Sequence, residues 1–247
     1  MKFTVPTDDG TELTLECPDT IAERWVCGDV LSGSTYPYIP FAGEVSTVVD
    51  IGANAGASSV YFAHHYPDAQ IHSVEPGSEI LEYLRRNVAD LPNVTVHPIG
   101  LHAEDQVATF YRGEDLTMSS IYARNVNTEE SEQIQIRAAG PWAAEQGLTE
   151  IDVLKVDVEG CEAEILESLG TLLPTVKVLY VEYDSRVARR TIEALLADTH
   201  ELYISRSFLD QGETLYLRKD LVIDTEVAHA HLRALWERGQ KAAAAQT

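Results

Sequence analysis

The sequence predicts a doubly wound α/β fold built on a mostly parallel sheet. From Val45 onward, short apolar segments alternate with amphipathic segments, as in a strand–helix repeat. Two apolar segments, Val48-Val49 and the run from Val178 to Val181, are nearly continuous, which is typical of central strands buried on both faces. The first of them runs into a glycine-rich turn and then a helix.

Length and composition limit the possible functions. The chain has 247 residues with 18 Lys+Arg and 40 Asp+Glu, a net charge of −22. The length is enough for one large domain with a sizeable core, and 45% hydrophobic residues exclude a disordered or collagen-like chain. The charge argues against a nucleic-acid partner and against docking on an anionic membrane; a solvated acidic surface explains it better than an acidic active site does.

Cysteine content and hydropathy predict where the protein resides. The three cysteines are an odd number without CxxC spacing, which indicates neither a disulfide framework nor a zinc site. The N-terminus lacks the apolar core of a signal peptide, and no apolar run is long enough to cross a bilayer. We therefore expect a cytoplasmic protein without membrane insertion.

Residues 1–44 are predicted to form an N-terminal extension. Residues 3–16 alternate around Asp9-Gly10, a pair suited to a tight hairpin turn. Thr20 and Glu23 have capping-box spacing and begin a short helix that carries Trp25. The stretch 28–43 is rich in Gly, Ser, Tyr and Pro and is predicted to be a loop.

Residues 45–220 are predicted to form the main domain, followed by a C-terminal helix and tail at 221–247. Ser78 is a candidate helix N-cap and Gly170 a C-cap glycine. The predicted strands are 46–51, 70–75, 93–97, 151–157 and 176–183, and the predicted helices are 57–66, 78–90, 161–169 and 187–197. An extra strand pair, 107–111 and 133–136, encloses a polar loop at 113–131, and segments 200–205 and 213–218 form a terminal hairpin.

The first candidate site is Asp50-Ile51-Gly52-Ala53-Asn54-Ala55-Gly56, after the first strand. Gly52 and Gly56 permit close approach of backbone amides and a ligand, and the helix N-terminus beyond them favours negative charge. A dinucleotide-binding loop requires glycines at 52, 54 and 57, but Asn54 and Ala57 occupy the last two positions. Asp50 favours a ligand with a cationic amine. S-adenosylmethionine (SAM), with a carboxylate, an ammonium and a sulfonium, fits this turn better than a dinucleotide.

Two further segments carry ionisable residues at predicted strand ends. Glu75 lies 75 − 56 = 19 residues after Gly56, where doubly wound nucleotide sites place an acidic residue for the ribose hydroxyls. Strand alternation puts Lys155, Asp157 and Glu159 on one side, facing the crevice. A buried ion pair between Lys155 and a Glu is the structural alternative. Glu159 could also simply begin the next helix, where carboxylates are favoured.

DIGANAG, SVEP and LKVDVEGCE, in this order and spacing, resemble the FkbM-type SAM-dependent methyltransferases. The resemblance runs from about Trp25 to about Arg218 and implies the class I methyltransferase fold, Rossmann-like and seven-stranded, with an antiparallel last strand. It implies O-methylation of a hydroxyl on a small molecule or glycan, such as a sugar, glycolipid or polyketide. It also implies that the loop 113–131, with Met118-Ser119-Ser120, covers the substrate.

SAM is therefore the expected cofactor. We expect Asp50 and the turn from Gly52 through Asn54 to Gly56 to hold its methionine end, and Glu75 to hold its ribose. Pro76 is expected to pack on the adenine, and fold analogy places Gly100 and Leu101 on its other side. Tyr36 and Tyr38 in the early loop could close over the cofactor, although tyrosines in surface loops are common.

An alcohol loses its proton during methyl transfer, so a general base or a metal is expected beside it. Asp157, at the end of a central strand, is the first candidate and Glu159 the second. Asp157, Glu182 and Asp184 form an alternative Mg²⁺ site. A metal-free site is favoured, because the resemblance does not by itself imply a metal.

Two other functions compete with methyl transfer. A nucleotide-dependent oxidoreductase is disfavoured by the glycine register, and a SAM-binding module without catalytic groups is the non-enzymatic alternative. The charge predicts a neutral or cationic acceptor rather than nucleic acid. The sequence does not determine the oligomeric state.

Overall fold

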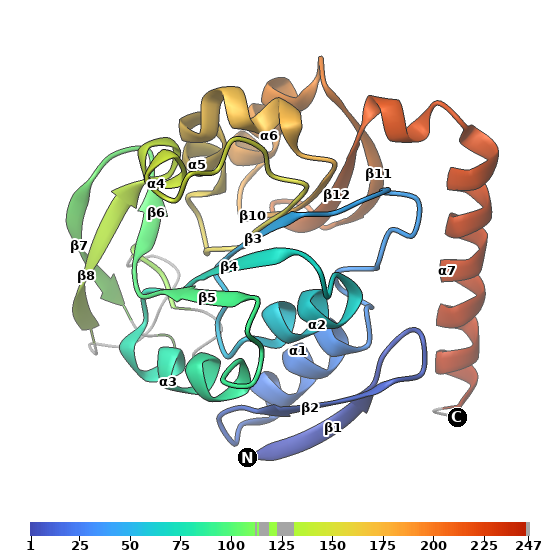
Figure 1. The fold of residues 1–247 in the computed structure, drawn as a ribbon, viewed down its shortest axis with the longest axis horizontal. Helices are drawn as coiled ribbons and strands as arrows, with labels where there is room; N and C mark the ends of the chain where they lie inside the picture. The colour runs from blue at the N-terminus through green and yellow to red at the C-terminus, as the bar shows by residue number, and fades with distance from the viewer. Residues whose placement is uncertain (112, 114–118, 123–130, 246–247) are drawn as a thin grey trace.

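The computed structural model describes residues 1–111, 113, 119–122 and 131–245 (Figure 1). Its centre is a seven-stranded sheet in the order β11-β12-β10-β9-β3-β4-β5. The strands are β3 (Thr47–Ile51), β4 (Gln70–Val74), β5 (Val94–His97), β9 (Val153–Val156), β10 (Val178–Tyr183), β11 (His200–Ser207) and β12 (Gly212–Arg218). The doubly wound α/β prediction is confirmed.

Helices cover both faces of this sheet, with α1, α2 and α3 on one face and α4, α5 and α6 on the other (Figure 1). Their bounds are α1 (Ile21–Leu31), α2 (Ala57–His65), α3 (Ser78–Asn87), α4 (Ala139–Glu145), α5 (Glu162–Leu169) and α6 (Arg186–Leu196). Short 3₁₀ turns, Gly170–Thr175 and Lys219–Val222, follow α5 and β12. Each face therefore has its own apolar core.

Strand direction follows the predicted pattern. β10, β9, β3, β4 and β5 pair in parallel, whereas β12 lies antiparallel between β10 and β11. A tight turn joins β11 to β12, and Phe208 N donates to Gln211 O across it at 2.8 Å. This turn makes β12 run antiparallel to β11. Strand order reverses between β3 and β9, and ligands bind at such a point in open α/β sheets.

Side-chain alternation places polar groups on one face at the carboxyl end of the central strands. Val48, Val153 and Val178 contribute to the core under α1–α3, and Val49, Leu154 and Leu179 to the core under α4–α6. Asp50, Lys155 and Glu182 continue the first of these series, by the two-residue period of each strand. Asp50 and Lys155 are also direct register partners.

The N-terminal extension shares the core beneath α1–α3. β1 (Lys2–Pro6) and β2 (Glu12–Glu16) form the expected antiparallel hairpin, and Thr20 Oγ1 caps α1 by accepting from Glu23 N at 3.1 Å. The prediction of a loop from residue 28 is wrong, because α1 continues to Leu31. Burial of Val30 and Leu31 against α2 outweighs the cost of about 1 kcal/mol for Gly28 inside a helix.

A second, three-stranded sheet has the order β6-β8-β7, formed by β6 (Gly100–His102), β7 (Gln106–Tyr111) and β8 (Ser131–Ala138). The predicted pair β7–β8 is confirmed, and β6 joins it as an additional parallel strand. α4 was not predicted because Gly140 and Pro141 usually interrupt helices. Proline is tolerated in a first turn, and a Cβ at Gly140 would overlap the Ser168 carbonyl oxygen of α5.

Helix ends differ in part from the predictions. The N-cap of α3 is Gly77, and Ser78 is the first residue of the helix. The prediction of Ser78 as the N-cap is therefore wrong by one residue. α3 also ends at Asn87 rather than residue 90. Gly170 is the predicted C-cap of α5, with a φ of 54°.

The C-terminal helix α7 (Thr225–Ala245) lies along one side of the molecule and reaches the N-terminal hairpin (Figure 1). Tyr203 of β11 donates to Ala228 O at 2.8 Å, and Arg238 Nη1 lies 3.0 Å from Asp8 Oδ2. Across the part of the chain that the structure describes, no helix combines the length and apolarity needed to span a membrane.

Candidate active site

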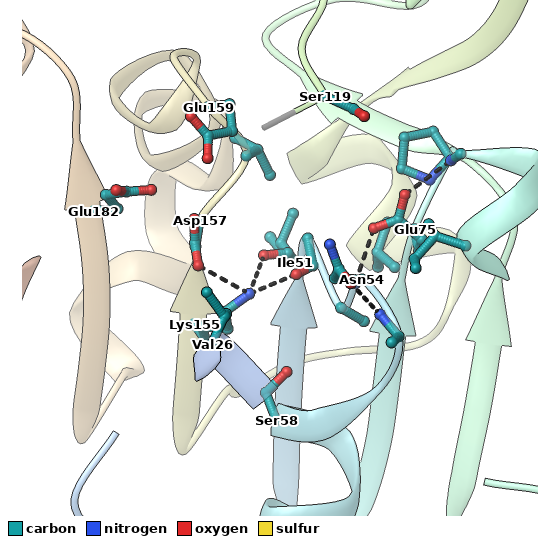
Figure 2. A pocket seen from close by; sticks show the side chains of 18 of the residues that line it. Val26, Ile51, Asn54, Ser58, Glu75, Ser119, Lys155, Asp157, Glu159 and Glu182 are labelled. Carbon is teal, nitrogen blue, oxygen red and sulfur yellow. Dashed lines mark hydrogen bonds and ion pairs between the residues drawn. The ribbon is translucent and has the colours of Figure 1, made fainter. Parts of the chain in front are cut away.

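A cavity of about 970 Å³ opens where the strand order reverses, at the carboxyl ends of β3 and β9. Its walls come from the turn after β3, the ends of β4, β9 and β10, the small sheet, α1 and the β11–β12 hairpin. Figure 2 shows Lys155 near the centre, Glu75 on one side, and Asp157, Glu159 and Glu182 gathered on the other.

The turn after β3 passes tightly between β4 and β9. Gly52 has a φ of 79°, and a Cβ there would overlap the Asp157 carbonyl oxygen. Gly52 N and Ala53 N both donate to Val74 O at 3.0 Å. Asn54 also has a positive φ, 49°, which asparagine tolerates better than most residues. Only glycine fits at position 52, because both the backbone conformation and the space exclude a side chain.

Glu75 connects this turn to α3. Its Oε2 accepts from Asn54 N at 2.9 Å, its Oε1 accepts from Gly77 N at 2.8 Å, and the residue is 5% exposed. Burial raises the pKa of Glu75 to about 7, although the two amide hydrogen bonds oppose the rise. Each carboxylate oxygen can accept a second hydrogen bond. The Glu75 carboxylate therefore accepts hydrogen bonds from two backbone amides and can still accept one from a ligand hydroxyl.

Asp50 lies beneath the turn rather than on the cavity wall, contrary to the expected direct contact with a ligand. It is fully buried, and its Oδ2 accepts from the hydroxyls of Ser58 and Ser59, each at 2.7 Å. Alternation along β3 turns the Asp50 side chain toward α2, so it fixes the start of that helix. Gly56, the N-cap of α2, also lies off the wall.

Lys155 joins the ends of β3 and β9. Its Nζ donates to Gly52 O at 2.5 Å and lies 3.5 Å from both Asp50 Oδ1 and Asp157 Oδ2. Burial lowers the pKa of Lys155, but the neighbouring carboxylates outweigh burial and raise it. The sequence left open a buried ion pair between Lys155 and a glutamate. Such an ion pair is present, but the partners of Lys155 are Asp50 and Asp157.

A hydrogen bond from the loop after α1 also holds the Asp157 side chain. Tyr36 donates to Asp157 Oδ2 at 2.7 Å, across 121 residues of sequence. Burial alone would raise the pKa of Asp157, but Lys155 and the hydrogen bonds to Asp157 keep it below its usual value. Tyr36 lines the cavity, whereas Tyr38 stacks on His65 with ring centroids 4.5 Å apart.

Three carboxylates meet beside Lys155: oxygens of Asp157, Glu159 and Glu182 all lie within 4.8 Å of one another. Burial, followed by the Asp157 charge, raises the pKa of Glu159 to about 8. The same causes raise the pKa of Glu182 well above its usual value, and its carboxyl hydrogen-bonds to Asp157. At neutral pH the cluster therefore retains protons that exposed carboxyls would lose.

Neighbouring hydrogen bonds hold Glu159 in a strained backbone conformation. Its φ is 61°, in the left-handed region that non-glycine residues rarely adopt. Ser120 Oγ donates to Glu159 O at 2.7 Å, and Glu162 Oε1 accepts from Val158 N and Gly160 N at 3.1 and 3.0 Å. Strain of this kind persists only where neighbouring groups enforce it, and it is common at functional sites.

The comparisons with known proteins agree with this architecture. Residues 50–238 match the family model described as the methyltransferase FkbM domain. The chain belongs to this family. Its seven-stranded domain is therefore the SAM-binding methyltransferase fold, as the resemblance implied.

Three curated relatives of this FkbM protein are methyltransferases by name. "Methyltransferase 1" of Beauveria bassiana is 28% identical over 57% of this chain and 65% of its own length. "2-O-methyltransferase NoeI" of Sinorhizobium fredii is 23% identical over 56% and 63%. "Methyltransferase sdnD" of Sordaria araneosa is 28% identical over 70% and 76%. The first two matches span slightly less than two thirds of the relative.

Most of the predicted site residues of the FkbM domain converge on the cavity. Those that line it are Gly52, Asn54, Glu75, Pro76, Gly100, Leu101, Asp157, Glu159 and Glu182. The alternative metal set is not assembled as predicted, because Glu159 rather than Asp184 completes the group with Asp157 and Glu182. In the expected covering loop, Ser119 and Ile121 line the cavity, and Met118 lies outside the described residues.

Sequence reasoning missed one wall of the cavity. Trp25 and Asp29 of α1, and Arg206, Phe208 and Glu213 of the β11–β12 hairpin, line it from two elements distant in sequence. None of them belongs to a motif. The available indication was an aromatic residue on the short predicted helix, Trp25, and another between the two predicted hairpin strands, Phe208, a pattern too common to identify a site.

Proposed function

We propose that this chain is a SAM-dependent O-methyltransferase that acts on a hydroxyl of a small molecule or glycan. Membership of the FkbM methyltransferase family supports methyl transfer. The relative named a 2-O-methyltransferase supports oxygen as the acceptor atom. The observation that carries the proposal is a single cavity with the buried Glu75 on one side and the Asp157–Glu159–Glu182 cluster on the other.

The cavity has groups suited to each part of SAM. Glu75 can accept from the ribose hydroxyls, and the cramped turn at Gly52 brings backbone toward the methionine end. Leu101 and Ile134 supply apolar surface for the adenine. Asp50 and Lys155 hold the turn in place from below. When bound, SAM supplies a methyl group activated by its sulfonium.

The carboxylate cluster positions and deprotonates the acceptor hydroxyl. Alignment of the acceptor oxygen accounts for much of the rate in such a displacement. Asp157 is held ionised by Lys155 and Tyr36, which reduces its basicity and suits it to orienting the hydroxyl. Glu159, with a pKa of about 8, is the stronger base in the molecules where it is ionised, about a tenth of them at pH 7 and half at pH 8. We therefore place Glu159 before Asp157 as the base, the reverse of the sequence-based preference.

The alternatives are less well supported. An oxidoreductase would require a dinucleotide loop, but Asn54 replaces the second glycine of that pattern. A non-catalytic SAM-binding module would not need a strained, proton-retaining Glu159. The net charge of −22 disfavours nucleic acid as the acceptor.

The deciding experiment is transfer of labelled methyl from SAM to metabolite extracts of the host, together with calorimetric titration of SAM and NAD. We expect SAM binding and a labelled small molecule or glycan, with transfer lost in Glu159→Gln and retained in Glu167→Gln, an exposed control on α5. Tight NAD binding without SAM binding would refute the proposal. SAM binding without transfer to any extract would support the non-catalytic module, and labelled RNA would refute the acceptor class.

A further inference from the structure

The cavity extends beyond the part assigned to SAM. Part of the remaining wall, here called the acceptor lobe, is formed by Trp25 and Asp29 from α1 and by Arg206, Phe208 and Glu213 from the β11–β12 hairpin. The lobe adjoins the Asp157–Glu159–Glu182 cluster, since Glu182, near the end of β10, pairs in register with Glu213 of β12. A molecule in the lobe would therefore reach the carboxylates that the proposed function assigns to the hydroxyl.

Two aromatic rings stand exposed on the lobe. Trp25 is 70% exposed and Phe208 is 75% exposed, although both line the cavity. Aromatic faces bind apolar ring faces by stacking and bind cations through the ring quadrupole. Their position on two separate elements favours a ligand that contacts both α1 and the hairpin.

The charged groups of the lobe carry an excess of negative charge. Arg206 Nη1 lies 3.7 Å from Glu213 Oε2, and its Nη2 donates to Ser34 O at 2.5 Å. This single guanidinium faces both Asp29 and Glu213. Burial raises the pKa of both carboxyls, and Arg206 only partly offsets the rise. A cationic ligand would relieve this imbalance, whereas an anionic one would increase it.

We infer that the acceptor lobe binds a hydroxylated ring compound that carries a protonated amine, with the ring against Trp25 and Phe208 and the ammonium toward Asp29 and Glu213. This inference rests on the proposed function and narrows its acceptor class. Amino sugars and hydroxylated aromatic amines share the required chemistry, so the experiment must distinguish between them.

The test is binding to protein saturated with S-adenosylhomocysteine, the demethylated form of SAM, so that no reaction occurs. Glucosamine, glucose and glucuronate share a hydroxylated six-membered ring and differ in charge at pH 7. Tyramine and 4-hydroxyphenylacetate provide the aromatic pair. We expect the cation of at least one series to bind about tenfold more tightly than its neutral or anionic counterpart, as for a charge-assisted contact. The series that binds identifies the ring type.

Tryptophan fluorescence locates the ligand. The chain has three tryptophans, and Trp236 on α7 is 70% exposed like Trp25 but does not line the cavity. The fluorescence change on amine binding should disappear in Trp25→Phe and persist in Trp236→Phe. Glu213→Gln should reduce the preference for the cation by about fivefold, as for loss of one partly exposed ion pair. Glu226→Gln, an exposed control on α7, should not.

The outcomes separate the two proposals. Failure to bind S-adenosylhomocysteine would refute the proposed function itself. Normal binding of that compound with no preference for cations, or with no binding in either series, would overturn only the acceptor inference. A fluorescence change that survives in Trp25→Phe would show that the amine binds elsewhere and would likewise overturn it.

Discussion

Replacement of Glu75 by glutamine tests how this chain holds SAM. The buried Glu75 carboxylate accepts from Asn54 N and Gly77 N and faces the cavity. Glutamine keeps the size and one acceptor oxygen but loses the charge. Hydrogen bonds to a charged group contribute about 1.5–3 kcal/mol each, so loss of the charge should weaken cofactor affinity about tenfold or more.

The pKa of Glu75 adds a pH dependence to this prediction. With a pKa of about 7, the carboxyl is mostly ionised at pH 8 and mostly protonated at pH 6. If the ribose hydroxyls require the ionised form, affinity should fall about tenfold over that interval. Glu75→Gln does not titrate, so its affinity should be low at both pH values.

Isothermal titration with S-adenosylhomocysteine at pH 6, 7 and 8 measures both effects. Glu82→Gln is the matched control, because Glu82 is an exposed glutamate on α3 that does not line the cavity. Wild type and Glu82→Gln should show the same pH dependence. Binding by Glu75→Gln as tight as that of wild type at pH 8 would refute the assignment of Glu75 to the ribose.

Ionisation of Glu75 should lower folding stability, although it should raise cofactor affinity. Its pKa rises from 4.5 in the unfolded chain to about 7 in the folded protein, so folding takes up a proton between these pH values. This contribution to stability is present below pH 4.5 and is lost as the pH rises through about 7, by at most about 3 kcal/mol. Urea unfolding at pH 5 and pH 8 should show a smaller decrease for Glu75→Gln than for wild type.

Three further predictions concern the rest of the site. Gly52→Ala should abolish cofactor binding, because its Cβ would overlap the Asp157 carbonyl oxygen; Gly147→Ala, with a φ of 74° but open space, should bind normally in the same titration. Lys155→Met should lower the free energy of unfolding in urea by about 3–5 kcal/mol, because it leaves Asp50 buried without its cation. Adding Asp50→Asn to this variant should recover part of that loss. Equal stability of the single and the double variant would contradict the ion-pair assignment. Turnover should be unchanged by EDTA; abolition by the chelator and rescue by Mg²⁺ would show that the reaction requires a metal and would overturn the metal-free site.

The sequence by itself determined the framework of the domain. Alternating apolar strands and amphipathic helices specify a doubly wound sheet, because each pattern buries its apolar face in only one way. The motif around Gly52 and the acidic strand end at Glu75 were also identified from spacing, since both depend on local backbone geometry. Lys155 and Asp157 were assigned to one side of β9 by the two-residue period alone.

Tertiary structure decided what these residues contact. Alternation along β3 turns Asp50 toward α2, but the hydrogen-bond donors that it meets there, Ser58 and Ser59, are visible only in the folded structure. Tyr36 reaches Asp157 only because α1 and its following loop fold over the sheet. The acceptor lobe arises in the same way, from a helix and a hairpin far apart in sequence. Such contacts depend on how elements pack, whereas a single sequence encodes directly only the periodicity within each element.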